Sequence, residues 1–580
     1  MSRNITVFGK TSPYEITLQS KEHPFAVDEY LIIQDTFNNN PLCRVISSEV
    51  TYLNNEKVYI ANAKVETTVK YPIDAGAVAT LPTFADIAPF IMNTKPKDGF
   101  VLGEVFGTSF SDIPSEYSEL VAMYSNGNVV PQTSVPFVFN YKKLFESPHI
   151  GLFGGSGSGK TVAMKVIIEE LMKRDIPGIL FDPHLEMNFA ESKPEIPNRY
   201  RVDFSTKFEI FTIGMNNFGI HFADLTTEEL VSIMSFSGEL SGAMESLVRT
   251  LHHNGMTLYE MRKMIDDLID AFNKEQNTFE ELTEHEKKLM STYRNKVPAP
   301  STLISISWRL NSLEMSGIFN GNINKLIETM QNRKICVLRG SMEQIHIVAA
   351  HVIERVYKMR RNFIDAREMG GTIDAEPFPP FFIGMDEAHL FCPNSTNFSL
   401  TKRIIKTIAQ EGRKYGVFEL LATQRPALLD ETIVAQISNK FIFRLSIKED
   451  IDSIKKETDL NASEIKKLPY MNSGECYVSS SIIGRTMFVK IRYGITMAKN
   501  AHNPFDELGS VVDLTPVEKA FIDNLPMNVL SVNNMQKHIK DTTGKTLSVA
   551  EIMKLGDDLA SKGFVISEKS MCGQSFMKKS

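Results

Sequence analysis

The stretch HIGLFGGSGSGKTVAMKVIIEELMKR, residues 149–174, joins an apolar run to a helix-like segment through a glycine-rich turn. Within it, Gly154-x4-Gly159-Lys160-Thr161 fits the P-loop pattern. Its glycines let backbone N–H groups turn inward around a phosphate, and the amino end of the helix adds partial positive charge. The order of strand, turn and helix predicts a parallel α/β sheet, and the turn predicts a bound nucleoside triphosphate rather than an empty loop.

Two residues of this P-loop have expected roles in phosphate chemistry. Lys160 is expected to reach the β- and γ-phosphates of ATP, and the Thr161 hydroxyl is expected to ligate Mg²⁺. The residues expected to hold the nucleotide are Gly155, Ser156, Gly157, Ser158, Gly159, Lys160, Thr161 and Val162.

A second apolar run, residues 381–385, ends in the two carboxylates Asp386 and Glu387. An Asp-Glu pair after a strand is also common at the solvated start of a helix. Combined with the P-loop, it predicts that Asp386 holds Mg²⁺ together with Thr161, and that Glu387 polarises the attacking water. The pair therefore predicts hydrolysis of the nucleotide and not only its binding.

Two further residues are candidates for the same reaction. Gln424 ends the apolar run 420–423, where it is expected to sense the γ-phosphate or to position water; a polar turn residue is the alternative. Arg413, in the segment between the apolar runs 381–385 and 420–423, is a candidate arginine finger. Fingers supplied by a neighbouring subunit raise rates by about 10³–10⁵. The alternative for Arg413 is a surface arginine at the end of a helix.

Five other charged residues keep two interpretations each. Asp182 and Glu186 follow the strand after the P-loop helix and lie either near the Mg²⁺ or simply in a loop. Lys402 and Arg403, with Lys406, lie on a helix-like stretch after the second carboxylate motif. They either touch DNA phosphates in a central pore or form a solvated basic face.

The pattern along the chain predicts an α/β protein built of several parts, as the length of 580 residues requires. Short strands separated by turns at the amino end favour a small β-barrel, and the helix-periodic region inside the core favours an insertion. Capping boxes and three short helices before GFVISEK favour a winged-helix-like unit at the carboxyl end. The expected parts are a barrel at 1–110, a connector at 111–148, a core at 149–500 with a helical insertion at 225–330, and the last unit at 505–580.

Composition narrows the class of protein. The formal net charge of −7 excludes a protein that simply coats nucleic acid, so any contact with DNA has to be local, for example in a channel. The five cysteines form no CxxC pair, which favours neither a zinc site nor a disulfide framework and fits a reducing cytoplasm. No apolar run approaches the roughly 20 residues of a membrane span, which argues against a membrane-anchored DNA pump.

From about His149 to Ile495, the ordered motifs GGSGSGKT, LFDPHLE, IGMDEAH, EGRKYGVFELLATQRP, ISNKFIFRL and SGECYV resemble the HerA branch of the HerA–FtsK translocases. The resemblance implies a RecA-like P-loop ATPase core behind a small β-barrel, a hexameric ring, ATP and Mg²⁺ at the subunit interfaces, and double-stranded DNA in the central channel. By the same resemblance Gln424 matches the polar sensor, and Arg413 matches the arginine that reaches into a neighbour's site. Two positions depart from the family pattern: Pro148-His149 replaces a frequent arginine, and Leu185 replaces a glycine.

HerA-type proteins work with an effector encoded nearby. The resemblance therefore implies a motor that powers or activates a partner, either a nuclease or a sirtuin-type NADase, in anti-phage defence, with the barrel as the docking surface. This chain shows no nuclease cluster of its own, so any cutting of DNA is expected from the partner. The alternatives are a scaffold ring that organises the effector without obligatory translocation, a motor for DNA end resection with a nuclease, and a conjugative or packaging pump.

Overall fold

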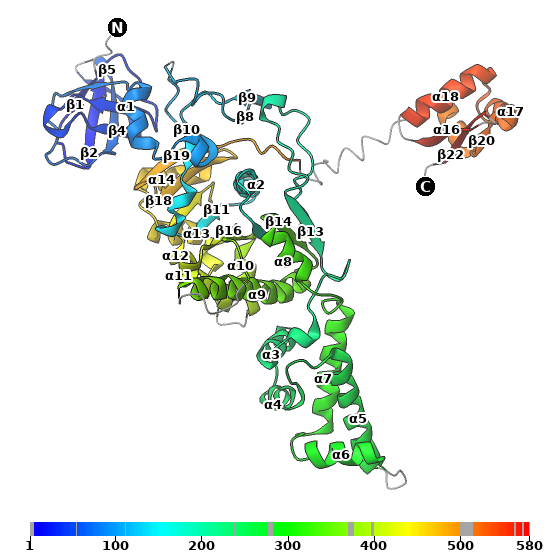
Figure 1. Ribbon diagram of the computed structural model, residues 1–580. Coiled ribbons are helices and arrows are strands. Elements are labelled where there is room, and N and C mark those ends of the chain that lie inside the picture. Colours follow the sequence, from blue (N-terminus) through cyan, green and yellow to red (C-terminus); the bar gives the residue numbers. More distant parts are fainter. Residues whose placement is uncertain are drawn as a thin grey trace. The chain divides into compact units, whose positions relative to one another are not determined.

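The computed structural model describes residues 5–53, 55–110, 112–236, 238–276, 282–368, 376–395, 399–497, 514–561, 564–570 and 573–578. The chain divides into two compact units, Met1–Lys499 and Asn500–Ser580 (Figure 1). None of the helices in the described ranges is long and apolar enough to cross a membrane.

The first unit begins with a closed six-stranded barrel, as the short strands predicted. Its strands pair in the order β1-β2-β5-β4-β3-β6. Alternating side chains such as Val7, Leu18 and Val45 fill the interior, as expected when every second residue of a strand points inward. The strands are β1 Ile5–Phe8, β2 Glu15–Ser20, β3 Tyr30–Ile33, β4 Leu42–Leu53, β5 Glu56–Val65 and β6 Val78–Thr80.

The centre of the first unit is an 11-stranded sheet in the order β10-β7-β19-β18-β17-β11-β16-β15-β12-β14-β13. The strands from β17 to β13 are parallel, and the strands from β18 to β10 add an antiparallel extension. The strands are β7 Phe100–Val105, β10 Pro136–Phe139, β11 Ile150–Phe153, β12 Gly178–Phe181, β13 Phe208–Thr212, β14 Ile335–Arg339, β15 Phe381–Met385, β16 Val417–Thr423, β17 Asn439–Ile442, β18 Glu475–Ser480 and β19 Arg485–Ile491.

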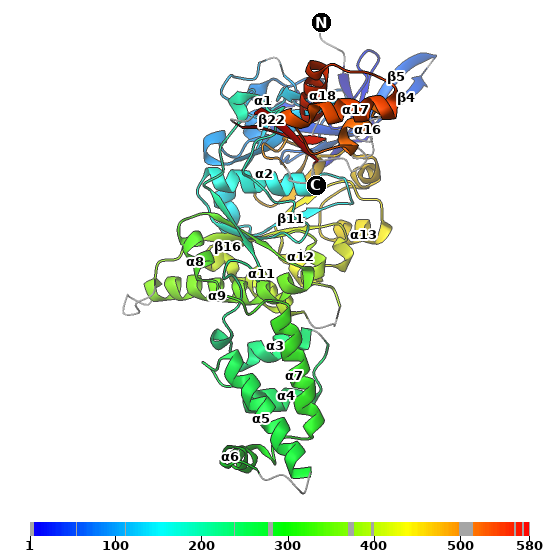
Figure 2. The same cartoon turned by 90° about the vertical axis from the view of Figure 1, so that its right-hand side faces the viewer.

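Helices cover both faces of this sheet (Figures 1 and 2). Helix α2, Lys160–Lys173, packs on one face, where it shares a core with Leu152 and Phe382. Helices α9 and α11 pack on the other face with Phe153 and Ile383. Besides α2, the helices of this unit outside the insertion are α1 Phe84–Ile91, α9 Met342–Glu368, α10 Ala388–Phe391, α11 Leu400–Tyr415, α12 Glu431–Gln436, α13 Lys448–Lys456 and α14 Ala462–Lys467.

Two segments before the P-loop form other structures than the sequence predicted. The run GFVLGEVFG, expected in the barrel, contributes β7 to the core sheet, and the expected connector contains the hairpin β8 Ala122–Ser125 with β9 Asn128–Pro131, as well as β10. Strand β7 lies so close to β19 that a Cβ on Gly103 would meet the carbonyl oxygen of Lys490 at 2.0 Å. A strand pattern alone does not say which sheet a strand joins, because that depends on partners distant in the sequence.

The helical insertion leaves the sheet after β13 and returns at β14. It begins with a capping box in which Thr226 and Glu229 exchange hydrogen bonds, as the sequence indicated. The insertion contains α3 Thr227–Phe236, α4 Gly242–Leu251, α5 Leu258–Gln276, α6 Glu284–Tyr293, α7 Pro300–Met315 and α8 Asn324–Gln331.

A buried arginine connects the barrel to the core. Arg44 of β4 donates to Asp28 Oδ1 at 2.6 Å and to Glu66 Oε1 at 2.9 Å, and it also pairs with Glu464 of α14. All four side chains are almost completely shielded from solvent. Buried charges of this kind require partners, so this contact fixes where the barrel meets the core.

The second unit has the helices and the hairpin of the winged-helix-like unit that the sequence indicated. Three helices enclose a core with Phe521, Met535 and Phe576, and a short sheet in the order β20-β22-β21 supplies the hairpin. The elements are α16 Pro516–Asp523, α17 Val532–Thr543, α18 Val549–Ser561, β20 Met527–Asn528, β21 Val565–Ser570 and β22 Gly573–Lys578.

Candidate active site

The P-loop joins the carboxyl end of β11 to the amino end of α2. Gly157 and Gly159 have φ values of 66° and 103°, in the left-handed region that favours glycine. A Cβ on Gly159 would also lie only 2.7 Å from the backbone nitrogen of Gly474. The glycines therefore serve both the turn and its close packing against the loop before β18, where the Gly474 N–H donates to the Ser158 carbonyl at 2.9 Å.

Lys160 points back into the P-loop. Its Nζ donates to the Gly155 carbonyl at 3.1 Å, and Ser158 Oγ donates to the same oxygen at 2.8 Å. Burial lowers the pKa of Lys160, while the nearby carboxylates Asp386 and Glu387 act in the opposite direction. A charged amine held inside a ring of backbone groups is suited to exchange a carbonyl oxygen for a phosphate oxygen.

The Thr161 hydroxyl lies 3.3 Å from Asp386 Oδ2, although the two residues are 225 positions apart. Burial raises the pKa of Asp386, and Lys160 opposes that shift. A hydroxyl and a carboxylate are hard oxygen donors, which Mg²⁺ prefers in sites that also use phosphate oxygens. The residues present therefore fit the magnesium ion that the sequence predicted.

Glu387 follows β15 and adopts a left-handed backbone with a φ of 50°. Gln424, at the end of the neighbouring strand β16, donates from its backbone N–H to Glu387 Oε2 at 3.3 Å and from Nε2 to Oε1. Because β16 lies between β11 and β15, Gln424 stands between the P-loop and the carboxylate pair. The fold brings these predicted residues together at the carboxyl edge of the parallel strands.

The sequence reasoning did not include His389. Its Nδ1 lies 2.9 Å from Thr423 Oγ1 and 3.4 Å from Glu387 Oε2. Burial lowers the pKa of His389 more than Glu387 raises it, so the neutral ring is favoured at neutral pH. The IGMDEAH motif contained this histidine, and its spacing of two residues from Glu387 was the available signal.

Arg413 lies away from the P-loop of its own chain. From the last turn of α11, its Nη1 donates to the Glu146 carbonyl at 3.3 Å. Glu146 precedes β11, whereas the P-loop follows it, and the four-residue strand separates the two ends by about 13 Å. Arg413 is therefore at the amino edge of the sheet, opposite the site formed by Lys160 and Glu387.

His149, where the family pattern often has arginine, contributes no charge to the site. Its ring nitrogens lie 3.0 Å from the Ala409 carbonyl and 3.1 Å from the Glu419 N–H. Burial lowers the pKa of His149 to about 4, so the ring is neutral at physiological pH.

Asp182 is fully engaged with protein donors. One carboxylate oxygen accepts from the Glu186 N–H at 2.8 Å, and the other accepts from the Met187 N–H at 3.1 Å and from Arg339 Nε at 3.0 Å. The carboxylate holds the loop after β12, in which Leu185 adopts a φ of 60° where the family pattern has glycine. Glu186 is close enough to Asp386 to contribute to the raised pKa of that carboxyl.

The basic residues of α11 have different environments. Lys402 Nζ lies 2.9 Å from Asp430 Oδ2 and donates to the Pro393 carbonyl at 2.8 Å, so it holds the loop beside the carboxylate motif. Arg403 is 79% exposed and only 3.5 Å from Glu354, an arrangement that leaves its guanidinium accessible to solvent anions.

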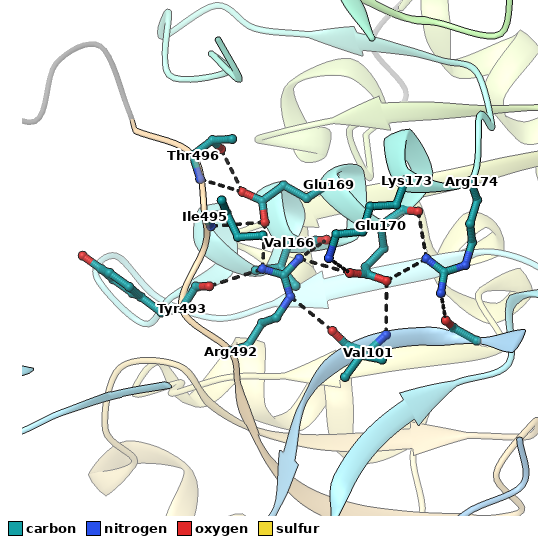
Figure 3. Close-up of polar contacts among 11 residues, drawn as sticks. Val101, Val166, Glu169, Glu170, Lys173, Arg174, Arg492, Tyr493, Ile495 and Thr496 are labelled. Atoms are coloured by element: carbon teal, nitrogen blue, oxygen red, sulfur yellow. Dashed lines mark hydrogen bonds and ion pairs between the residues drawn. The ribbon is translucent and has the colours of Figure 1, made fainter. Parts of the chain in front are cut away.

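A buried network of ion pairs holds the P-loop helix α2 in place (Figure 3). Glu169 accepts from Arg492 Nη1 and from Thr496 N and Oγ1, each at 2.8 Å. Glu170 accepts from Arg492 Nη2 at 3.3 Å and from Arg174 Nη1 at 2.8 Å. The segment after β19 is thereby fixed to the helix that starts at Lys160.

Arg492→Ala is expected to lower the free energy of unfolding by about 3–5 kcal/mol, because it leaves two buried carboxylates without their shared cation. Urea unfolding followed by far-UV circular dichroism measures the change. The matched control is Arg361→Ala, which removes an exposed arginine 3.4 Å from Asp365 and should cost less than about 1 kcal/mol. Equal losses for the two variants would contradict the structural role of Arg492.

The fold and the site define a P-loop α/β protein of the RecA-like kind, with a nucleotide site at the carboxyl edge of its parallel strands. Residues 124–356 match the family described as "Helicase HerA, central domain". This part of the chain is thus similar to the central domain of HerA helicases, as the ordered motifs indicated.

Curated relatives show the same similarity. The DNA double-strand break repair helicase HerA of Saccharolobus solfataricus is 25% identical over 355 residues, 59% of this chain and 64% of that protein. The protein of the same name from Sulfolobus acidocaldarius is 21% identical over 348 residues, 60% of this chain and 65% of that protein. The matches thus span slightly less than two thirds of these relatives. Among solved structures, VirB4 of Thermoanaerobacter pseudethanolicus is similar over 71% of this chain and 98% of that chain, with 13% identity and a TM-score of 0.40.

Proposed function

We propose that this chain is a HerA-type ATP hydrolase that uses Mg²⁺. The observation that carries the proposal is the convergence of Lys160, Thr161, Asp386, Glu387 and Gln424 from three parallel strands onto one edge of the sheet. The pairing of a P-loop with a carboxylate that contacts a glutamine supports hydrolysis over binding alone, because the glutamine orients the group that would polarise water.

Each residue has a role that follows from its position. Thr161 and Asp386 hold Mg²⁺, which when bound neutralises charge on the phosphates. Lys160 leaves the Gly155 carbonyl and binds the phosphate chain. Glu387 accepts a hydrogen bond from the attacking water and draws its proton away, so that electron density stays on the water oxygen, and Gln424 fixes the carboxylate that does so.

We further propose that the active unit is a hexameric ring in which Arg413 completes the site of the neighbouring subunit. The support is the place of Arg413 at the amino edge of the sheet, about a strand length from the P-loop of its own chain. A residue so placed reaches a P-loop only across a subunit interface. Hydrolysis would then depend on assembly.

Double-stranded DNA is the proposed track of this ring. The relatives are named helicases of DNA double-strand break repair, and the net charge of −7 restricts DNA contacts to a local surface. Arg403 is a candidate for such a contact because its guanidinium is largely exposed.

We propose that the ring powers or activates a partner effector, a nuclease or a sirtuin-type NADase, in anti-phage defence within the cytoplasm. The names of the relatives favour a second candidate, a DNA end-resection motor with a nuclease.

Native mass spectrometry of the tagged protein purified from its own genetic locus, with ATP and Mg²⁺, tests the assembly. We expect a mass of about six subunits together with a second polypeptide, whose identity would name the effector. A bare hexamer would support a stand-alone motor, and a monomer under all nucleotide conditions would contradict the ring.

A further inference from the structure

Arg444 follows β17 and lies directly against the P-loop. Strand β17 pairs in parallel with β11, so the two chains leave the sheet side by side. The Arg444 carbonyl accepts from the Gly155 N–H at 2.8 Å, which fixes its backbone to the loop. Its Nη2 lies 3.5 Å from the carbonyl oxygens of both Ser156 and Gly157. The guanidinium therefore stands over the outer turn of the P-loop.

The contacts of this guanidinium are weak. Both distances of 3.5 Å are at the long end for an N–H···O hydrogen bond, and such bonds weaken steeply with length. No ion pair joins Arg444 to a carboxylate in the part of the chain that the structure describes. By contrast, Arg425, which follows β16 on the other side of β11, has its Nε 3.1 Å from Asp450 Oδ2. Arg444 thus places a positive charge beside the P-loop with only carbonyl oxygens to neutralise it.

We propose that Arg444 binds the phosphate chain of the nucleotide held by the P-loop of its own subunit. The inference rests on the proposed function, in which this P-loop binds ATP. On binding, the guanidinium exchanges the Ser156 and Gly157 carbonyls for phosphate oxygens. Charge-assisted hydrogen bonds of this type are shorter and about twice as strong as neutral ones, and the planar fork of arginine matches two oxygens at once.

The charge balance of the site supports this role. Asp386 and Glu387 bring negative charge to the position that a triphosphate would approach, and Lys160 opposes this charge. Arg444 supplies a second cation on the other side of the loop from the carboxylates. Because its backbone is bonded to Gly155, the side chain needs only a change of rotamer to reach a phosphate.

Titration of the full-length protein with fluorescent ADP and with a fluorescent non-hydrolysable ATP analogue, both with Mg²⁺, tests the proposal. Arg444→Ala is expected to raise the Kd for each nucleotide by about 10- to 100-fold, the range for a lost hydrogen bond to a charged group. Arg444→Lys should restore part of the affinity because it keeps the charge but not the fork. Arg361→Ala, an exposed arginine on α9, is the control and should leave both Kd values unchanged.

Thermal unfolding separates phosphate binding from a purely structural role. If Arg444 binds phosphate, Arg444→Ala keeps the Tm of the nucleotide-free protein and reduces the rise in Tm that saturating nucleotide gives the parent. An unchanged Kd, or a lower nucleotide-free Tm with an unchanged nucleotide-induced rise, would overturn the proposal. Lys160→Ala distinguishes a failure of the proposed function from a failure of the Arg444 proposal. If Lys160→Ala binds nucleotide as tightly as the parent protein does, the proposed function itself fails. If Lys160→Ala loses binding while Arg444→Ala does not, only the role of Arg444 fails.

Discussion

Glu387→Gln is expected to lower ATP turnover by about 10²–10⁴-fold and to leave nucleotide binding intact. The carboxylate follows Asp386 directly and is contacted by Gln424, so in the proposed mechanism its loss removes the group that polarises water. Glutamine has nearly the same shape and keeps an acceptor for the Gln424 N–H, while it removes the charge. Phosphate release measures turnover, and titration with fluorescent ADP measures binding.

Glu354→Gln is the matched control, because Glu354 is a glutamate on α9 that pairs with exposed Arg403 and touches none of the P-loop residues. Undiminished turnover in Glu387→Gln would contradict the catalytic assignment. The same variant separates two models of function once the effector is known. Loss of effector output would exclude a pure scaffold ring, and retained output would exclude an obligatory motor.

Arg413→Ala is expected to lower turnover by about 10³–10⁵-fold while each subunit still binds nucleotide. The physical reason is position, since Arg413 contacts Glu146 at the amino edge of the sheet and cannot reach the P-loop of its own chain. Mixing Arg413→Ala subunits with Lys160→Ala subunits should restore part of the activity. In such a mixture an intact arginine from one variant can face an intact P-loop from the other.

Lys414→Ala changes the adjacent residue of the same helix turn and should retain most of the activity. Absence of restoration at every mixing ratio, together with a large loss of nucleotide affinity in Arg413→Ala alone, would indicate that the arginine acts within its own subunit. That result would contradict the geometry described above.

Local sequence predicted most of the residues that meet at the candidate site, because the motifs are short and lie at strand ends. Gly154 to Thr161 form one continuous turn, and the strand ending at Asp386 is apolar along its length. The contact between Thr161 and Asp386 then follows from parallel pairing, which brings the carboxyl ends of strands to a common edge. Arg444 and Gly474 lie within the motifs ISNKFIFRL and SGECYV, but those motifs do not indicate that the two residues lie next to the P-loop.

Other features depend on tertiary structure. The β7 strand has the same short, turn-bounded pattern as the barrel strands, and its place beside β19 is decided by packing across nearly 400 residues of sequence. The sequence pattern places Lys402 on a basic helix face. In the structure, its amine pairs with Asp430 and donates to the Pro393 carbonyl. A helix pattern states which residues share a face but not what that face meets.

The amino-acid sequence by itself determined the P-loop, the carboxylate pair, the α/β core, the helical insertion and the barrel, because these follow from local backbone preference and periodic burial. Tertiary structure alone decided which edge of the sheet each side chain occupies. Arg413 and Gln424 are only 11 positions apart, yet β16 carries them to opposite edges, because a strand advances about 3.3 Å per residue. That separation places Gln424 at the P-loop of its own chain and Arg413 away from it.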